Sequence, residues 1–161
     1  MKVHKRIFAA VSVILLNLCL VSAAYAGSPV EDLILKYESV HGAKDYKASG
    51  AAMSVGRTFL KKYPIAPLAD DIDEMLILRM EKTSPDVKKR FEKDFLEAVK
   101  TYMYIGKQDT KQGVTDVYCL VNSNQIVEEL IVYNPAVHAL NCLRGNMDPQ
   151  ELMKIRKHVE E

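Results

Sequence analysis

Residues 114–143 constrain the fold more than any other stretch, because they contain three consecutive apolar runs separated by two short polar segments. The runs lie at 114–121, 126–133 and 137–143 and are rich in β-branched and aromatic side chains, which favour strands. The separating segments, 122–125 and 134–136, supply Asn, Ser and Pro residues that tolerate turn dihedrals. This stretch therefore predicts a three-stranded antiparallel meander.

Helical spacing and capping signals predict four helices outside the meander. Three of them begin with a proline directly after Ser28, Ser84 or Asp148, and are expected at about 28–40, 84–99 and 148–159. The fourth is expected over 51–63. Its buried side should be lined by Ala52, Val55, Phe59 and Tyr63, with Met53, Gly56 and Leu60 beside them. Pro64 and Pro67 should end this helix.

Two further strands are expected, at 74–80 and 101–105, while 45–49 fits either a brief strand or a loop. The segment 106–113 is polar, has glycine at both ends and should connect two strands. Together these elements predict a single α+β domain over 27–161. Its antiparallel sheet should have about five to six strands, packed against about four helices.

Residues 1–26 have the three parts of a secretory signal peptide. Lys2, Lys5 and Arg6 form the basic end, 7–20 is apolar apart from Ser12 and Asn17, and Ala24-Tyr25-Ala26 has the small-x-small cleavage pattern. We expect cleavage near Ala26 and a periplasmic or secreted chain that begins at Gly27. The rival interpretation is a retained membrane anchor, which the apolar run disfavours because a span needs about 20 residues. Leu18 before Cys19 disfavours a lipoprotein.

Removing this segment takes away three basic residues and no acidic residue, so the formal net charge changes from +1 to −2. A near-balanced charge of this kind does not favour binding to nucleic acid or to an anionic membrane surface. We expect neither partner, and no membrane insertion after cleavage.

Two cysteines remain in the mature chain, Cys119 and Cys142. A meander that is symmetric about its turns places Cys119 opposite Glu128, and Glu128 opposite Cys142. The two thiols would then share one sheet face with a whole strand between them. Their α-carbons would lie roughly 10 Å apart, beyond the roughly 7 Å limit for a disulfide. We therefore predict two free thiols.

In this register a thiol, a carboxylate and an imidazole could converge, because His138 would lie opposite Val132 on the same sheet. Such groups can form a nucleophile site or bind a soft metal. However, free cysteine is often a small buried hydrophobe, and no Cys-x-x-Cys pair is present. We therefore assign no catalytic residue, no metal ligand and no cofactor, and we do not expect an enzyme.

The remaining titratable candidates fit ordinary surface roles better than a site. His41 and His158 lie at a helix end and in the last helix, where surface or capping positions are expected. Asp70, Asp71 and Asp73 could bind calcium, but the glycine and the alternating ligands of a calcium loop are missing. A solvated linker is the better interpretation. No phosphate-binding loop or nucleophile elbow is present.

Both faces of the predicted meander are largely apolar when its residues are divided by alternation. One face would carry Val117, Cys119, Val121, Ile126, Leu130, Val132, Leu140 and Cys142. The other would carry Val114, Tyr118, Leu120, Val127, Ile131, Tyr133, Val137, Ala139 and Leu143. A two-layer domain normally leaves one face polar, so the second face needs a cover. Helices of the same chain, a second copy, a partner or an apolar ligand would each provide one.

The segment 128–132, the run 137–143 and the Arg144-Gly145-Asn146-Met147-Asp148-Pro149 stretch resemble a known family. The similarity is to domain-of-unknown-function family 4252, whose members end in a strand, a Gly-Asn turn and an acidic helix start. The N-terminal order of signal peptide, helix, short strand, helix and apolar strand is similar as well. The resemblance implies a small α+β domain exported by Gram-negative, Bacteroides-type bacteria, with no established activity.

These features favour a non-enzymatic binding or interaction module of the cell envelope. The family resemblance suggests a link to envelope signalling. Self-association or an envelope protein partner would use an apolar sheet face. The first alternative is a carrier of a small apolar ligand, whose cleft that face would line. The second alternative is an unrecognised hydrolase or redox enzyme that uses Cys119, Cys142, Glu128 or His138.

Overall fold

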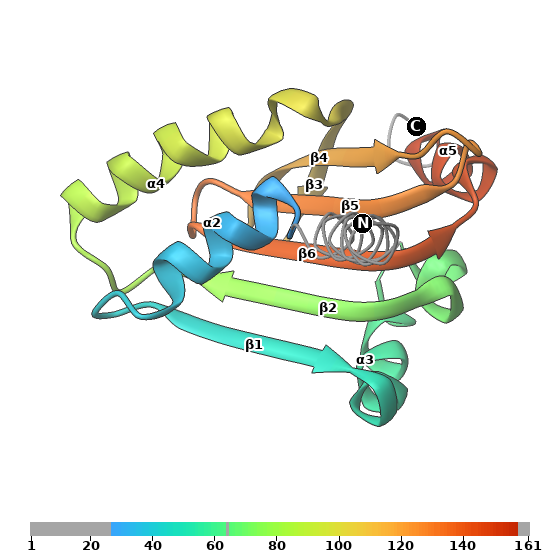
Figure 1. Cartoon of the computed structure of the whole chain (residues 1–161), viewed down its shortest axis with the longest axis horizontal. Helices are drawn as coiled ribbons and strands as arrows, with labels where there is room; N and C mark the ends of the chain where they lie inside the picture. Colours follow the sequence, from blue (N-terminus) through green and yellow to red (C-terminus); the bar gives the residue numbers. More distant parts are fainter. Residues whose placement is uncertain (1–26, 64, 158–161) are drawn as a thin grey trace, which may run out of the picture.

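The computed structural model describes residues 27–63 and 65–157 and has the α+β fold predicted from the sequence (Figure 1). Its six strands form one antiparallel sheet in the order β1-β2-β6-β5-β4-β3. The strands are β1 (Lys44–Ser49), β2 (Ile72–Arg79), β3 (Met103–Thr110), β4 (Gly113–Val121), β5 (Val127–Asn134) and β6 (Ala139–Met147). The expected signal peptide lies outside the described residues.

The meander at 114–143 is confirmed as β4, β5 and β6, and the strand expected at 74–80 is β2. The segment 45–49 is a strand, at one edge of the sheet. The polar connection expected at 106–113 was wrong, because β3 continues to Thr110 and β4 begins at Gly113. Lys107 and Asp109 belong to this opposite edge strand, where charged side chains protect unpaired backbone groups from other chains.

The proline-opened helices are confirmed as α2 (Pro29–Glu38), α4 (Pro85–Ala98) and α5 (Pro149–Lys157). At α2 the Ser28 hydroxyl accepts a hydrogen bond from the Glu31 amide at 3.1 Å, and at α4 Ser84 accepts one from Val87. These bonds satisfy amides that have no partner inside a helix. The local signals therefore fix where α2 and α4 begin.

Helices α2 and α4 lie across one face of the sheet, which we call the first face and which carries Cys142. Their apolar sides meet the sheet in a core that includes Leu33, Tyr37, Phe91, Phe95, Leu78, Ile131, Tyr133 and Leu140. The aromatic rings contact one another, with the centroids of Phe95 and Tyr133 4.3 Å apart. This core holds both helices on the sheet.

The other face, which we call the second face, carries Cys119 and a separate core. It is covered by α3 (Met53–Leu60), the 3₁₀ helix η3 (Ala66–Asp71) and α5. Figure 1 shows α3 and α5 near the same end of the strands. Helices of the same chain therefore shelter parts of both faces, which is one of the four covers expected from the sequence.

The buried side of α3 differs from the prediction. Met53, Gly56 and Leu60 are buried, whereas Val55 and Phe59 are 71% and 47% exposed. The two sets of residues form neighbouring stripes of the helix. The buried stripe contains Gly56, the one glycine of α3. A Cβ at Gly56 would lie 3.6 Å from the Met75 side chain on β2, so this stripe allows the closest approach to the sheet.

The predicted register of the meander was wrong on both sides of β5. Cys119 pairs with Leu130 rather than with Glu128, and Cys142 pairs with Ile131. The β5–β6 turn has four residues, 135–138, so the third strand begins at Ala139. An odd shift in register moves every side chain of a strand to the other face. The two cysteines therefore lie on opposite faces.

Strand β6 also extends beyond the predicted end at 143 and includes Gly145, Asn146 and Met147, which were expected to form a turn. Gly145 has a packing role in this strand. A Cβ at this position would collide with the Asp71 carbonyl oxygen on the chain that enters β2. The glycine therefore lets β6 and β2 approach at their bulge between Ile72 and Glu74.

Candidate functional site

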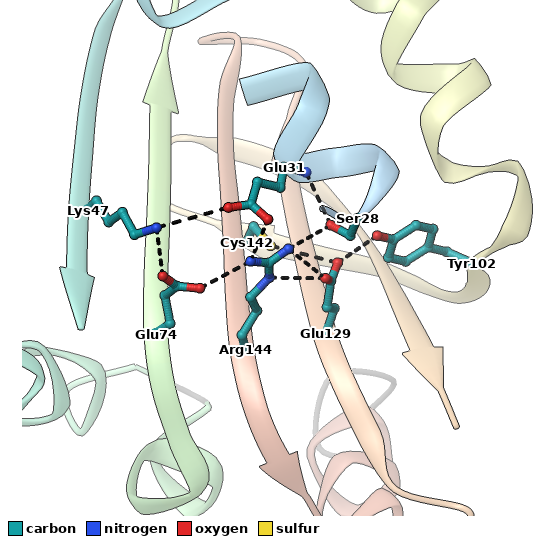
Figure 2. Close-up of polar contacts among 8 residues, drawn as sticks. All are labelled: Ser28, Glu31, Lys47, Glu74, Tyr102, Glu129, Cys142 and Arg144. Carbon is teal, nitrogen blue, oxygen red and sulfur yellow. Dashed lines mark hydrogen bonds and ion pairs between the residues drawn. The ribbon is translucent and has the colours of Figure 1, made fainter. Parts of the chain in front are cut away.

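Three charged side chains meet on the first face because their strands are neighbours in the sheet. Arg144 on β6 pairs with Glu74 on β2 at one side and with Glu129 on β5 at the other. The N-terminal end of α2 lies above them and contributes Ser28 and Glu31 (Figure 2). The sheet order therefore builds a charged cluster from four separate parts of the sequence.

The Arg144 guanidinium is the centre of this cluster. Its nitrogens lie 2.8 Å from a Glu31 oxygen, 3.1 Å from Glu74 and 3.0 Å from Glu129, and one nitrogen donates to the Ser28 hydroxyl at 2.9 Å. A planar guanidinium has five N–H donors, so it can bind several carboxylates at once. Arg144 thereby ties the start of α2 to three strands.

Two further side chains complete what we call the Arg144 cluster. Lys47 on β1 lies 2.8 Å from Glu74 and 4.0 Å from Glu31, and the Tyr102 hydroxyl donates to Glu129 at 2.6 Å. The cluster consists of Ser28, Glu31, Lys47, Glu74, Tyr102, Glu129 and Arg144. It holds three carboxylates and two cations, so its formal charge is −1 when all are ionised.

Pairing in the cluster overcomes the cost of burial. Burial alone would lower the pKa of the Arg144 guanidinium, but Glu129, Glu31 and Glu74 raise that pKa above its ordinary value. Burial would raise the pKa of the Glu74 carboxyl, yet hydrogen bonds from Lys47 and Arg144 bring that pKa below its ordinary value. Both groups are therefore held in their charged forms.

The lowered pKa of Glu74 predicts an acid-dependent loss of stability. A carboxyl whose pKa is lower in the folded than in the unfolded state stabilises the fold above the unfolded pKa, and this contribution is lost as the pH falls through the folded pKa. Glu74→Gln should therefore cost about 1–3 kcal/mol at pH 7, and the difference from wild type should shrink below about pH 4.

Urea denaturation at a series of pH values measures this difference. Glu38→Gln is the matched control, because Glu38 is an exposed acid at the other end of α2. A difference between Glu74→Gln and wild type that stays constant from pH 7 to pH 3 would contradict the prediction.

Cys142 lies beside the cluster, with its sulfur 3.9 Å from a Glu129 oxygen. Burial, and then the Glu129 charge, raises the pKa of the Cys142 thiol, and burial raises the pKa of the Cys119 thiol. A thiol that stays protonated is a poor nucleophile and a poor metal ligand. Both cysteines are free and buried, so the prediction of free thiols is confirmed. The strand register from which it was argued was wrong.

The thiol, carboxylate and imidazole grouping expected from the sequence does not form. Glu128 is exposed and accepts a hydrogen bond from Asn122, while the carboxylate beside Cys142 is Glu129. His138 lies in the β5–β6 turn, with its Nε2 2.9 Å from Glu92 on α4. The structure therefore places these candidates apart.

The aspartates and histidines considered in the sequence analysis do not form a metal site in the described part of the chain. Asp70 and Asp73 pair with Lys61 and Arg57, at 2.8 Å and 3.1 Å, and the expected linker forms η3 and the start of β2. His41 is exposed, as expected. His158 lies outside the described residues. Within the described part of the chain, no group of three or more His, Cys, Asp or Glu residues is arranged to hold a metal ion.

The second face has a row of paired residues that crosses all six strands. The pairing places Tyr46, Ile77, Asn141, Val132, Val117 and Gly106 side by side, and we call this set the open row. The neighbouring row is buried under α3, η3 and α5 on five strands, at Ala48, Met75, Leu143, Leu130 and Cys119, whereas its β3 member, Met103, is 55% exposed. The open row is less covered: Tyr46 is 50% exposed and the others are partly buried.

A small cavity of about 90 Å³ lies where the open row meets α5. Its walls are mostly apolar and include Val117, Val132 and Leu130 from the sheet and Leu152 and Ile155 from α5. Gly106, at the bulge of β3, is also part of the wall, and a Cβ there would meet no atom within 4 Å. The cavity is smaller than the roughly 300–1,000 Å³ of ordinary ligand pockets.

Scans of this chain against protein-family models, curated proteins and solved structures return no match. The resemblance to domain-of-unknown-function family 4252 therefore stays a prediction. Among the described residues, no helix combines the length and the apolar character that a membrane span requires.

Proposed function

We propose that this protein is a non-enzymatic binding or interaction module of the cell envelope, exported by its signal peptide, and that it docks another protein chain on the open row. The observation that supports this proposal is the uneven covering of the second face. The neighbouring row is buried under helices on five of the six strands, whereas the open row presents Tyr46, Ile77, Val132 and Val117 with less cover.

The open row is long enough to contact an extended surface of another protein. Adjacent strands are about 4.8 Å apart, so a row across six strands is roughly 24 Å wide. Asn141 lies in its middle, between Ile77 and Val132. An apolar strip with a polar group inside it is typical of surfaces that bind protein partners.

We expect the docking to be lost when a charge is placed in the open row. Val132→Lys puts an ammonium group in its centre, and Tyr46→Lys does so at a half-exposed edge position where the fold is least affected. Leu96→Lys on α4 is the matched control, because Leu96 is 60% exposed on another part of the surface. The row variants should weaken association by at least about tenfold, which is about 1.4 kcal/mol.

Sedimentation and light scattering over a range of concentrations measure self-association. A photo-crosslinking residue at position 46, compared with one at position 96, detects a partner in the periplasm of the native host. A strict monomer at every concentration, together with no crosslink specific to position 46, would contradict the proposal.

A small apolar-ligand carrier is the second candidate function, and the cavity beside the open row supports it. Its volume of about 90 Å³ would accept only a small group, since a cavity of about 150 Å³ holds one benzene molecule. Native mass spectrometry of protein purified from its own host would detect a retained ligand. An unmodified mass, with unchanged stability when small apolar compounds are added, would argue against the carrier.

A further inference from the structure

Gly27, the expected first residue of the mature chain, lies against two carboxylates. A Cβ at Gly27 would lie 3.1 Å from an oxygen of Glu31 and 3.1 Å from an oxygen of Asp32. The backbone nitrogen of Gly27 is bonded to the same α-carbon, at about 1.5 Å, so it lies within roughly 6 Å of both carboxylates. Any charge on this nitrogen would interact with both carboxylates.

Cleavage would create such a charge. Hydrolysis of the Ala26–Gly27 peptide bond consumes one water molecule and leaves a carboxylate on Ala26 and an ammonium group on Gly27. Before cleavage the same nitrogen is an uncharged amide. Signal-peptide removal at this bond therefore changes the charge beside Glu31 by +1.

Around Glu31 the carboxylates outnumber the cations, although the Glu31 oxygen nearest to Gly27 already binds Arg144 at 2.8 Å. Arg144 and Lys47 reach Glu31 from β6 and β1, but these two cations face three cluster carboxylates. Asp32 adds a further exposed carboxylate on the same turn of α2. The positive end of the α2 dipole opposes a cation here, but it acts with about half a unit charge against two full negative charges.

We propose that the Gly27 ammonium group produced by cleavage after Ala26 is a member of the Arg144 cluster, binds Glu31 and Asp32, and couples export processing to the stability of the fold. This inference rests on the proposed export of the chain, but not on the docking of a partner. Cleavage then adds a further ion-pair partner at the start of α2, which the Arg144 cluster joins to the sheet.

The titration of the amine provides the readout. Opposite charges at this distance should raise the pKa of the Gly27 amine above the ordinary 7.7–8.0. A group whose pKa is raised on folding stabilises the fold below its unfolded pKa, and this contribution disappears as the pH rises through the folded pKa. The effect of the amine should therefore be full near pH 6.5 and absent near pH 10.

The test uses the full chain, exported and processed in a Gram-negative host. Its first residue is read from the intact mass, and the amine pKa is obtained from the pH dependence of its acetylation rate, folded and in urea. We expect a higher pKa in the folded protein. Asp32→Asn should reduce the difference, and Glu38→Gln, at the far end of α2, should leave it unchanged.

Acetylation of the amine should also lower the urea midpoint at pH 6.5 and leave it unchanged at pH 10. Equal amine pKa values in the folded and unfolded protein would overturn the proposal, as would a processed chain that begins at a residue other than Gly27. A partner that still binds in either case would show that the docking proposal is independent of this result.

Discussion

Arg144→Met should reduce the free energy of unfolding by about 3–5 kcal/mol. Arg144 binds Glu31, Glu74 and Glu129 at once, and the Glu129 residue is only 6% exposed. Methionine fills a similar volume but removes the nearest cation of Glu31 and Glu129, while Glu74 keeps Lys47 at 2.8 Å. Uncompensated buried charge is among the few single changes that cost this much. Urea denaturation at pH 7 measures the loss.

Adding Glu129→Gln to Arg144→Met separates lost contacts from stranded charge. If the cost comes from the unpaired Glu129 carboxylate, neutralising it should recover part of the loss, so the two changes are not additive. Glu129→Gln alone should destabilise, because it weakens the bonds to Arg144 and Tyr102. A loss of under about 1 kcal/mol for Arg144→Met would contradict the central role of the guanidinium.

The parts of the fold that could be predicted from the sequence are those fixed by local interactions. Ser28 and Ser84 cap helices whose first prolines follow them directly, so three or four residues carry the whole signal. The apolar strand at 74–80 and the meander were also predictable, because their composition is distinctive over the length of one strand. None of these predictions depends on distant residues.

The register could not be predicted, because it depends on the length of a turn. Asn134 accepts hydrogen bonds from the Ala136 and Val137 amides, and His138 takes a positive φ of 49°, which together close a four-residue turn. The predicted turn was one residue shorter and centred elsewhere. That difference moved Cys142 to the face opposite Cys119, and with it removed the expected thiol grouping.

The Arg144 cluster could not be predicted for a different reason. Arg144 is separated by 70 residues from Glu74 and by 116 residues from Ser28. These residues meet only because β2 pairs with β6 and α2 packs on the first face, and this arrangement is not encoded by any short motif. The available signal was weak: Arg144 directly follows the run at 137–143 that was predicted to be a strand, and Glu129 interrupts an apolar run.

The first face of the sheet contributes to stability, and the second face contributes both to stability and to the proposed docking. The first face is sheltered by α2 and α4, and the Arg144 cluster joins the start of α2 to its strands. The second face is sheltered mainly where α3, η3 and α5 lie. Most apolar residues of the two faces therefore belong to a core on each side. On the second face, the less covered ones form the open row.

Phe91→Ala should also cost about 3–5 kcal/mol, because it removes one of the two buried phenylalanines, Phe91 and Phe95, that join α4 to the first face. Phe91 is fully buried, and its ring centroid lies 5.1 Å from that of Tyr37 and 5.9 Å from that of Tyr133. The change therefore removes contacts to α2 and to β5 together and leaves a cavity between three elements. A well-packed core of this kind relaxes only partly around such a cavity.

Leu96→Ala on the same helix is the matched control, since Leu96 is 60% exposed and should change stability by no more than about 0.5 kcal/mol. Urea denaturation with an unchanged slope would show that Phe91→Ala affects the folded state rather than the compactness of the unfolded chain. If both variants lose less than about 1 kcal/mol, α4 is not held by its apolar side. The first face would then be as open to a partner as the second, and the preference for the open row would have no physical basis.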